Sequence, residues 1–273
     1  MVLYSCQKKS ESIPPKTSDN LDLSQISQKV YNALTSHSSV NVSRAPLDDP
    51  PETGPCSPPP CPDGWESYSF QVYETVSFYD ALKCPTNILY CCDSIVVNYY
   101  FRYCINPQTN EIIINFTNFV ATPLCDTVNQ YWSKLFGEGL YDSLDLEIER
   151  FDYDVGELYE TYVAQELMNG FGETFDCNTG VNYVQSNFIT ESCYKTCAKI
   201  VWDGGPKVDR TKVQCGYKCC KRHREYCLNS EDKAVEKIRV YTEINSCSNF
   251  GNLPPCTGGI YIGQCEKECG ERP

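Results

Sequence analysis

Closely spaced carboxylates between residues 145 and 157 are the side chains in this chain best suited to chemistry. The run Asp145-Leu146-Glu147-Ile148-Glu149 alternates acidic with apolar residues. On a β-strand, residues two apart lie on one face, and two opposed carboxylates can serve as the acid and base of a glycosidase. The sequence therefore predicts an acidic strand face. Three interpretations stay open: a catalytic pair, a cation site, or a solvated face over buried Leu146 and Ile148.

The acidic residues continue through the segment from Asp152 to Glu157. This segment is similar to the start of a calcium-binding loop, which spaces oxygen ligands along a turn. It departs from that pattern because the expected third ligand and the closing Glu are missing. No cofactor or metal is expected from the sequence, and calcium is the one that stays open. The candidate acidic or calcium site comprises Glu147, Glu149, Asp152, Asp154 and Glu157.

Nineteen cysteines form a second set of reactive side chains. Such a density indicates an oxidising compartment and disulfides. Cys215, Cys219, Cys220, His223 and Cys227 fall close enough together to suggest zinc instead, but their spacing is not that of the usual zinc motifs. We expect disulfides among Cys56, Cys61, Cys84, Cys91, Cys92, Cys104, Cys125, Cys177, Cys193, Cys197, Cys215, Cys219, Cys220, Cys227, Cys247, Cys256, Cys265 and Cys269.

Two pairs of cysteines are adjacent in the chain, Cys91-Cys92 and Cys219-Cys220. Neighbouring residues on a strand point to opposite faces. Each adjacent pair is therefore expected to bond two separate partners.

The remaining cysteine, Cys6, follows Leu3-Tyr4-Ser5. Leu3-Tyr4-Ser5-Cys6 resembles the lipobox of bacterial lipoproteins, and the polar run 7–11 resembles the stretch that follows the lipid-bearing cysteine in lipoproteins of the Bacteroidota. The resemblance implies lipid attachment at Cys6, a signal peptide encoded upstream, and a membrane partner held through the anchor. Setting Cys6 aside leaves an even number of cysteines, as a closed set of disulfides needs. The alternative is an ordinary cytosolic start with an incidental thiol.

Charge and motif content argue against several function classes. A net charge of −13 disfavours a nucleic-acid partner, because phosphate binding needs a basic face. The chain has no run of about 18 apolar residues that would span a bilayer as a helix. It also lacks the common hydrolase, metalloprotease and nucleotide-binding motifs. Of the two histidines, His37 precedes the body, and His223 is expected to be exposed.

Composition divides the chain into three regions. Residues 1–6 are expected to be the remnant of a lipoprotein signal, 7–63 a disordered tether rich in Pro and Ser, and 64–273 the folded body. The tether composition cannot bury enough apolar surface to offset the entropy of ordering. Cys56 and Cys61 bracket three prolines, and a bridge between them, or from them to the body, would end the tether.

Periodicity within the body predicts both strands and helices. Strands are expected at 68–78, 94–104 and 111–120, the last two as a hairpin, and later at 197–202, 211–219 and 235–244. Helices are expected at 127–136 and 156–168, and loops held by bridges at 247–273. The expected fold class is α+β: a disulfide-rich antiparallel sheet domain with two helices inserted mid-chain, preceded by a disordered tether.

The sequence assigns no catalytic residue. It favours a lipid-anchored or secreted protein of the cell envelope or outer surface that acts by binding or as a structural or accessory component. Its partner is expected to be an envelope or extracellular protein or a glycan, because 20 tyrosines and three tryptophans can supply a binding surface. The alternative is a secreted, carboxylate-dependent hydrolase of glycans or peptides.

Overall fold

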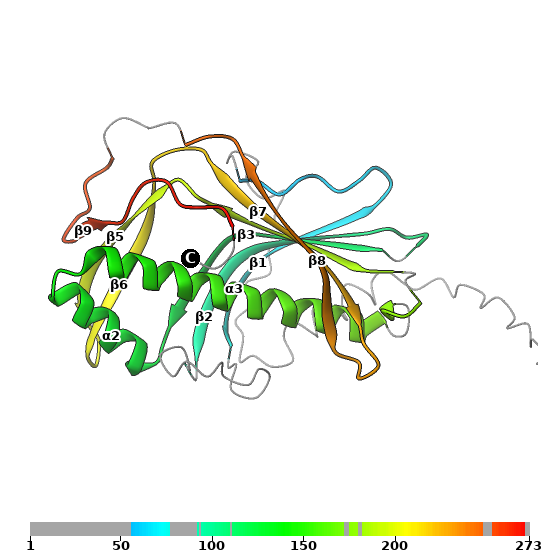
Figure 1. Ribbon diagram of the computed structural model, residues 1–273, viewed down its shortest axis with the longest axis horizontal. Helices are drawn as coiled ribbons and strands as arrows, with labels where there is room; N and C mark the ends of the chain where they lie inside the picture. Colours follow the sequence, from blue (N-terminus) through cyan, green and yellow to red (C-terminus); the bar gives the residue numbers. More distant parts are fainter. Residues whose placement is uncertain are drawn as a thin grey trace, which may run out of the picture.

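The computed structural model describes residues 56–76, 92, 94–109, 111–171, 175–179, 182–247 and 253–270. Cys6, Cys84, Cys91 and the predicted tether before Cys56 lie outside these residues. The part of the chain that is described forms two helices and nine strands in two sheets (Figure 1). Neither helix is long and apolar enough to cross a membrane.

Six strands form the larger sheet, in the order β1-β2-β3-β4-β7-β8. Their bounds are β1 Glu66–Val76, β2 Ile95–Ile105, β3 Ile112–Pro123, β4 Val184–Glu191, β7 Cys219–Leu228 and β8 Ala234–Ile244. All neighbouring pairs are antiparallel except β3 and β4, which are parallel. Both helices lie between β3 and β4 in the chain, and such a crossover is what a parallel pair requires.

Three strands form the smaller sheet, in the order β6-β5-β9. They are β5 Tyr194–Trp202, β6 Pro206–Gln214 and β9 Ile260–Ile262, and both pairs are antiparallel. Only Ser192 and Cys193 separate β4 from β5. The chain therefore passes directly from one sheet into the other, and the two sheets separate at this point.

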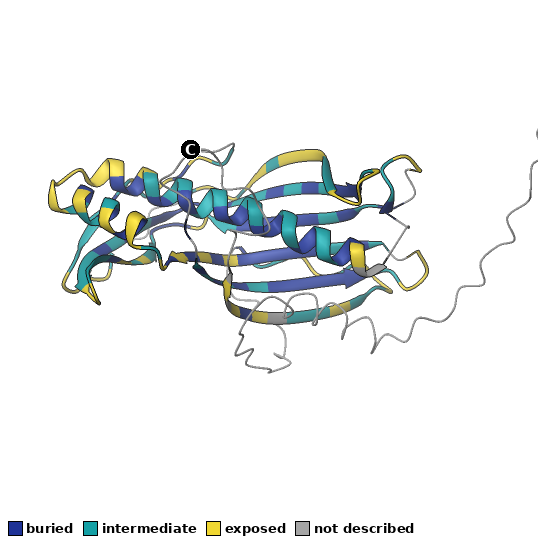
Figure 2. Cartoon of the chain, turned by 90° about the horizontal axis from the view of Figure 1, so that it is seen from below, coloured by how far each residue is buried: buried dark blue, intermediate teal, exposed yellow. Residues whose placement is uncertain are grey.

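Helix α2 (Asp126–Gly137) packs on β6, and the long helix α3 (Tyr141–Phe171) runs along one face of the larger sheet and reaches the smaller one (Figure 1). The side of α3 that faces the sheets is buried along its length (Figure 2). This stripe recurs every three or four residues, as a helix requires: it comprises Leu144, Ile148, Phe151, Val155, Tyr159 and Val163. Beneath it, the hydroxyls of Tyr99 on β2 and Tyr159 lie 2.6 Å apart.

The predicted strand at 145–149 is wrong, because these residues belong to α3. The helix predicted at 156–168 is also longer than expected, since Gly156 lies in its middle and not at its start. A Cβ atom at position 156 would lie 2.9 Å from the Phe188 ring of β4. Glycine therefore lets the helix approach the sheet closely at this point, at some cost in helix propensity.

The predicted α+β fold class with two helices mid-chain is confirmed. The hairpin at 94–104 and 111–120 is confirmed as β2 and β3. The strand predicted at 211–219 overlaps the second half of β6, but its end is wrong because β6 stops at Gln214. Strand β7, which begins at Cys219, was not predicted. Neither β4 nor β9 was predicted.

Eight disulfides connect the residues that the structure describes. They are Cys56–Cys219, Cys61–Cys104, Cys92–Cys125, Cys177–Cys227, Cys193–Cys247, Cys197–Cys256, Cys215–Cys265 and Cys220–Cys269. Adjacent Cys219 and Cys220 bond different partners, as predicted. The four cysteines of the possible zinc group bond four different cysteines, so their sulfur atoms are not free for zinc.

Two of these disulfides attach the segment from Cys56 to Cys61 to the large sheet. Arg222 and Arg224 of β7 point toward α3, so Cys219, in the alternate position, points to the opposite face. Cys56 bonds Cys219 there, and Cys61 bonds a cysteine on β2. The disulfide-linked body thus includes residues that the composition assigned to the tether.

Candidate functional site

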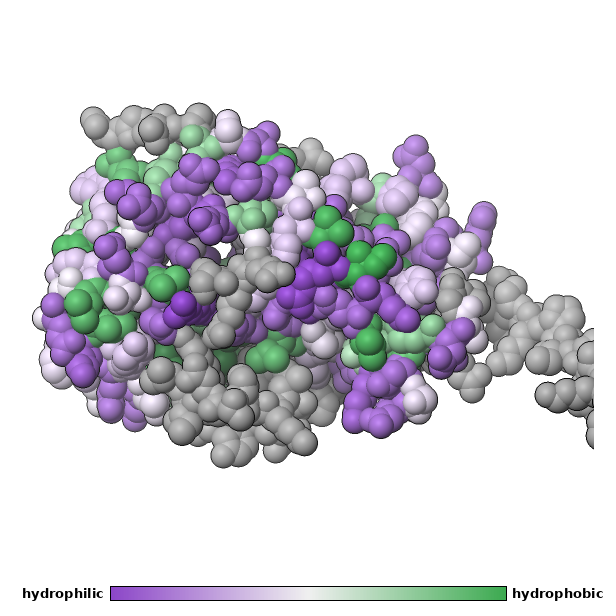
Figure 3. Space-filling view, viewed as in Figure 1, coloured by the Kyte–Doolittle hydropathy of each residue, from purple (hydrophilic) through white to green (hydrophobic). Residues whose placement is uncertain are grey.

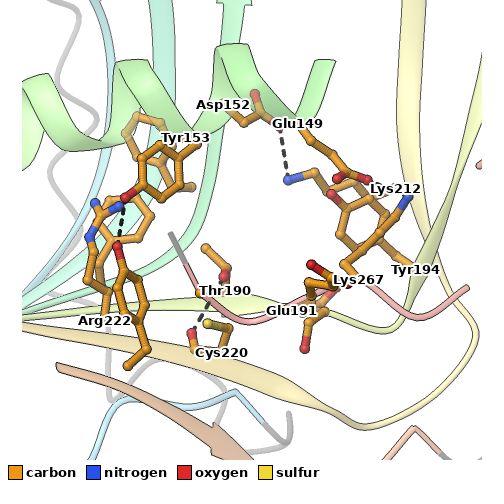
Figure 4. A pocket seen from close by; sticks show the side chains of 16 residues that line it. Glu149, Asp152, Tyr153, Thr190, Glu191, Tyr194, Lys212, Cys220, Arg222 and Lys267 are labelled. Atoms are coloured by element: carbon orange, nitrogen blue, oxygen red, sulfur yellow. Dashed lines mark hydrogen bonds and ion pairs between the residues drawn. The ribbon is translucent and has the colours of Figure 1, made fainter. Parts of the chain in front are cut away.

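A polar pocket lies beneath α3 where the two sheets separate (Figure 4). Its volume is about 110 Å³, and a water molecule occupies about 30 Å³ in the liquid. The pocket therefore has room for a few waters or one small group of a ligand. Its lining residues are Phe119, Glu149, Asp152, Tyr153, Phe188, Thr190, Glu191, Ser192, Tyr194, Lys212, Cys220, Arg222, Tyr241, Lys267, Glu268 and Gly270.

Three parts of the chain far apart in sequence form its walls. Helix α3 supplies the roof, and the ends of β4 and β7 supply the floor at Thr190 and Cys220 (Figure 4). The C-terminal segment 265–270 forms part of one side. Disulfides Cys215–Cys265 and Cys220–Cys269 flank this segment, so it is attached to the sheet at both ends.

Lys267 joins the C-terminal segment to α3 through a buried ion cluster. Its ammonium group pairs with Asp145 and lies 2.5 Å from Glu149 Oε1. Thr196 Oγ1 on β5 donates to Asp145 Oδ1 at 3.1 Å. Burial raises the pKa of the Glu149 carboxyl, and Lys267 opposes this shift only in part.

Asp152, one helical turn further along α3, forms a second buried cluster with β6. Arg210 Nη2 lies 2.6 Å from Asp152 Oδ1, and Lys212 Nζ lies 3.1 Å from Oδ2. Burial by itself raises the pKa of Asp152, but the two cations outweigh it and leave this pKa below its usual value. Lys212 also lies over the Tyr194 ring, 4.9 Å from its centroid.

Glu191 is the pocket carboxyl at the end of β4. Its Oε1 accepts a hydrogen bond from Gln214 Nε2 at 3.0 Å. Burial raises the pKa of Glu191, and Lys212 lowers it by less. One pocket thus holds Glu149 and Glu191 with raised pKa values and Asp152 with a lowered one.

A third ionic group closes the other side of the pocket. Glu160, with no exposed surface, accepts hydrogen bonds from Arg222 Nη2 at 2.7 Å and from Arg224 Nη1 at 3.3 Å. Glu157 lies 2.6 Å from Arg239 Nη1, and Glu236 pairs with Arg224 and Arg239. Three carboxylates therefore face three guanidinium groups, so this network has no net charge.

Two tyrosines lie beside Arg222 of this network in the pocket wall. The Tyr153 and Tyr241 hydroxyls lie 2.7 Å apart. Arg222 lies over the Tyr153 and Phe188 rings, 5.0 and 4.8 Å from their centroids. Figure 4 shows Tyr153 and Arg222 on one side of the opening, and Glu149, Tyr194 and Lys267 on the other.

The structure separates the acidic residues that the sequence placed on one face. Glu149 and Asp152 line the pocket, whereas Glu157 belongs to the arginine network. Glu147 pairs with Arg150 on the same helix at 3.1 Å, and Asp154 is half-buried on α3. A helix turns by about 100° per residue, so alternate residues do not share a face.

The predicted calcium loop is also wrong as a conformation, because residues 152–157 are helical. Among the residues that the structure describes, no three His, Cys, Asp or Glu side chains form a group suited to a metal ion. Calcium binding by these carboxylates stays a prediction. It would have to compete with the ammonium and guanidinium groups that the carboxylates already contact.

His223 differs from its prediction as well. Its side chain is 25% exposed, and its Nδ1 lies 2.9 Å from Asn187 Oδ1 on β4. It occupies the alternate position to Arg222 and Arg224 and so points away from the pocket. It has no part in the candidate site.

Most pocket residues were not identified from the sequence. Lys267 lies between Cys265 and Cys269, a spacing that indicates a bridged loop, but only the disulfide pairing places it under α3. Glu191 and Ser192 lie in and after β4, which was not predicted. Ser192 is 2% exposed, and its hydroxyl is without a hydrogen-bond partner in the described part of the chain.

The site suits binding better than nucleophilic chemistry. Among the described residues, no base lies within hydrogen-bond distance of Ser192 Oγ, so none of them activates this hydroxyl. The cysteines near the pocket are in disulfides. What the pocket offers is a set of donors, acceptors and aromatic faces fixed in place by ion pairs. Comparisons of this chain with protein-family models, with curated proteins and with solved structures found no match.

Proposed function

We propose that this protein acts outside the cytoplasm, in the cell envelope or after secretion, as a binding protein that accepts a polar group of its ligand in the pocket beneath α3. The resemblance at Cys6 supports a lipid anchor, with which the protein would stay at the membrane surface. The disulfides support an oxidising location. The pocket is the observation that carries the binding function.

The pocket lining supports a small, polar ligand group. Four carboxyl groups, three cationic groups and three tyrosines face a space of about 110 Å³. Ion pairs and two flanking disulfides hold many of these side chains, so little rotamer entropy is lost when a ligand binds. The space would admit one end group of a glycan or one side chain of an extracellular protein, with the rest of the ligand outside.

The outer surface agrees with a polar recognition mode. In Figure 3 the visible face is mostly hydrophilic, and its hydrophobic residues are scattered in small groups. Large apolar patches are typical of protein docking surfaces. The face that is drawn therefore gives little support to recognition through a broad apolar contact.

One observation favours the alternative, a hydrolase. Glu149 and Glu191 have raised pKa values and Asp152 a lowered one, and such a difference between neighbouring carboxyls is what an acid and base pair requires. Against catalysis, Lys267 already contacts Glu149, while Arg210 and Lys212 contact Asp152.

Filling the pocket tests the binding function. The full oxidised chain, its Thr190→Phe variant and a control Thr211→Phe variant would be applied to a glycan array and to extracellular proteins. Thr190 lines the pocket, whereas Thr211 is exposed on β6. We expect the wild type and the control to bind the same ligand and the pocket variant to lose about tenfold or more in affinity. Equal binding by all three would overturn the proposal.

Turnover decides between binding and hydrolysis. If the bound glycan or protein is cleaved, and Glu149→Gln abolishes cleavage while leaving affinity intact, the hydrolase is the correct function. The location is tested by the intact mass of protein from its native producer, with and without reductant. A lipid on Cys6 and oxidised cysteines would support it, and free thiols with Met1 intact would refute it.

A further inference from the structure

The structure assigns a ligand class to this pocket: we propose that the group it accepts is a protonated amine, held by the Glu191 carboxylate, the Ser192 hydroxyl and the surrounding aromatic rings. The inference rests on the proposed function and makes it more specific. It names a small organic cation, such as the ammonium group of an amino sugar or of a lysine side chain.

The balance of charge at the pocket is the first argument. Four buried or half-buried carboxyl groups belong to it: Glu149, Asp152 and Glu191 in the lining and Asp145 behind Lys267; the lining residue Glu268 is exposed to solvent. Three cations pair with this group, namely Arg210, Lys212 and Lys267. Arg222 is matched within the neutral arginine network. Four acids against three cations leave one negative charge uncompensated, and a cationic ligand would balance it.

The aromatic lining is the second argument. The negative faces of aromatic rings attract cations. The rings around this pocket already hold the protein's own cations, since Lys212 and Lys267 lie 4.9 and 5.1 Å from the Tyr194 centroid. Phe119 and Tyr241 are also in the lining. An entering ammonium group would therefore meet both carboxylates and rings.

Ser192 is the third argument. Ser192 is one of the lining residues, and its buried hydroxyl has no hydrogen-bond partner among the described residues. A buried polar group without a partner costs free energy. An ammonium group has three donors, so it can satisfy a hydroxyl oxygen and a carboxylate together.

The raised pKa values of Glu149 and Glu191 agree with this assignment. Both result first from burial, and the nearby cations reduce them only in part. A bound ammonium would favour the ionised carboxylates, so binding would release protons and become tighter as the pH rises. The other charged or titratable groups facing the pocket are Asp152 and Tyr153 on α3, Tyr194 on β5, Lys212 on β6, Arg222 on β7, Tyr241 on β8, and Lys267 and Glu268.

Matched pairs of small molecules test the ligand class. The full oxidised chain would be titrated by NMR with ethanolamine against ethylene glycol, and with glucosamine against glucose. We expect each amine to bind about tenfold more tightly than its neutral partner, with shifts centred on the pocket. Affinity for ethanolamine should rise from pH 5 to pH 8, because its amine remains protonated over this range. Glucosamine loses its proton at lower pH than a simple alkylamine, so it is compared with glucose at about pH 6.

Three variants identify the groups that hold the amine. Glu191→Gln should lower amine affinity by about tenfold, whereas Glu138→Gln, at the exposed residue that follows α2, should not change it. Ser192→Ala should lower amine affinity by about fivefold, as for one hydrogen bond. The same variant should leave the melting temperature equal or higher, because it removes an unsatisfied buried hydroxyl. A purely structural role for Ser192 would give the opposite pattern.

The outcomes separate this inference from the proposed function. Equal affinity for amines and their neutral partners, or unchanged amine affinity in Glu191→Gln, would overturn the amine assignment. If neutral sugars bind and Thr190→Phe abolishes that binding, the amine assignment fails while the binding function stands. If Thr190→Phe has no effect on any ligand, both fail.

Discussion

Replacing Gly263 by alanine is expected to destabilise the fold far more than one methyl group usually does. Gly263 precedes the C-terminal segment and has φ +76°. A Cβ atom at this position would lie well inside van der Waals contact of the Asp145 carboxylate. Asp145 is buried and pairs with Lys267, so its carboxylate cannot move aside without breaking that ion pair.

The magnitude has two parts. A non-glycine residue in the left-handed region costs about 1–2 kcal/mol. Separating a buried ion pair costs about 3–5 kcal/mol, because a charge is left without its partner. We therefore expect Gly263→Ala to lower the free energy of unfolding by about 4–7 kcal/mol.

Gly258 provides the matched control. It has nearly the same φ, +75°, but a Cβ atom there would meet nothing within 4 Å. Gly258→Ala should cost only the backbone part, about 1–2 kcal/mol. Guanidinium unfolding of both variants at pH 7, with the disulfides intact, measures the difference. In an Asp145→Ala background, the two glycine substitutions should cost the same.

The result that refutes this reasoning is simple. If Gly263→Ala and Gly258→Ala lower the free energy of unfolding equally in the wild-type background, the Asp145 carboxylate does not restrict position 263. The close contact between the C-terminal segment and α3 would then not contribute to stability.

Further predictions concern the buried charges, one disulfide and calcium. Glu160→Gln should lower the free energy of unfolding by about 3–5 kcal/mol, because two buried guanidinium groups lose their carboxylate partner. The exposed control Glu138→Gln should lower it by less than about 0.5 kcal/mol. Equal losses in the two variants would show that the arginine network does not stabilise the fold. Replacing Cys61 and Cys104 by alanine should lower the free energy of unfolding by about 4 kcal/mol, because the disulfide closes a loop of 43 residues. An unchanged unfolding midpoint would show that this disulfide does not stabilise the fold. The pKa of Asp152 is lowered in the folded state, so its contribution to the free energy of unfolding is present above its unfolded pKa of about 3.9 and is lost as the pH falls through the folded value. Asp152→Asn should therefore make the melting temperature depend less on pH below pH 4. If the melting temperatures of the variant and the wild type fall in parallel, the ion pairs of Asp152 do not stabilise the fold. Calcium at a few millimolar should leave the melting temperature within about 1 °C of that in chelator, whereas a site with a Kd of about 0.1 mM would add about 2 kcal/mol and a rise of several degrees.

Much of the fold follows from local pattern. The alternating apolar residues of 94–104 and 111–120, with a turn between them, predict a hairpin, and β2 and β3 form one. Adjacent cysteines point apart on a strand, so separate partners for Cys219 and Cys220 followed from geometry alone. The density of cysteine likewise indicated a protein held by disulfides before any pairing was known.

The segment 145–149 shows where local pattern fails. Its acidic and apolar residues alternate as in a strand, yet it begins a helix whose buried stripe extends to Val163. A window of five residues cannot distinguish the two periods. Gly156 favoured the same wrong prediction, because glycine destabilises a helix interior and so suggested that the helix begins there. In the structure, glycine is required at this position because the Phe188 ring lies too close for a side chain.

The pocket was decided by tertiary structure alone. Lys267 lies more than a hundred residues from Asp145 in the chain, and Glu191 meets Lys212 only because the two sheets separate after β4. Composition showed that charges were plentiful and that cysteines would bond. The pairing of these charges depends on the order of the strands and on the disulfide partners. Both are decided by the packing of the whole molecule, because no local preference distinguishes one distant partner from another.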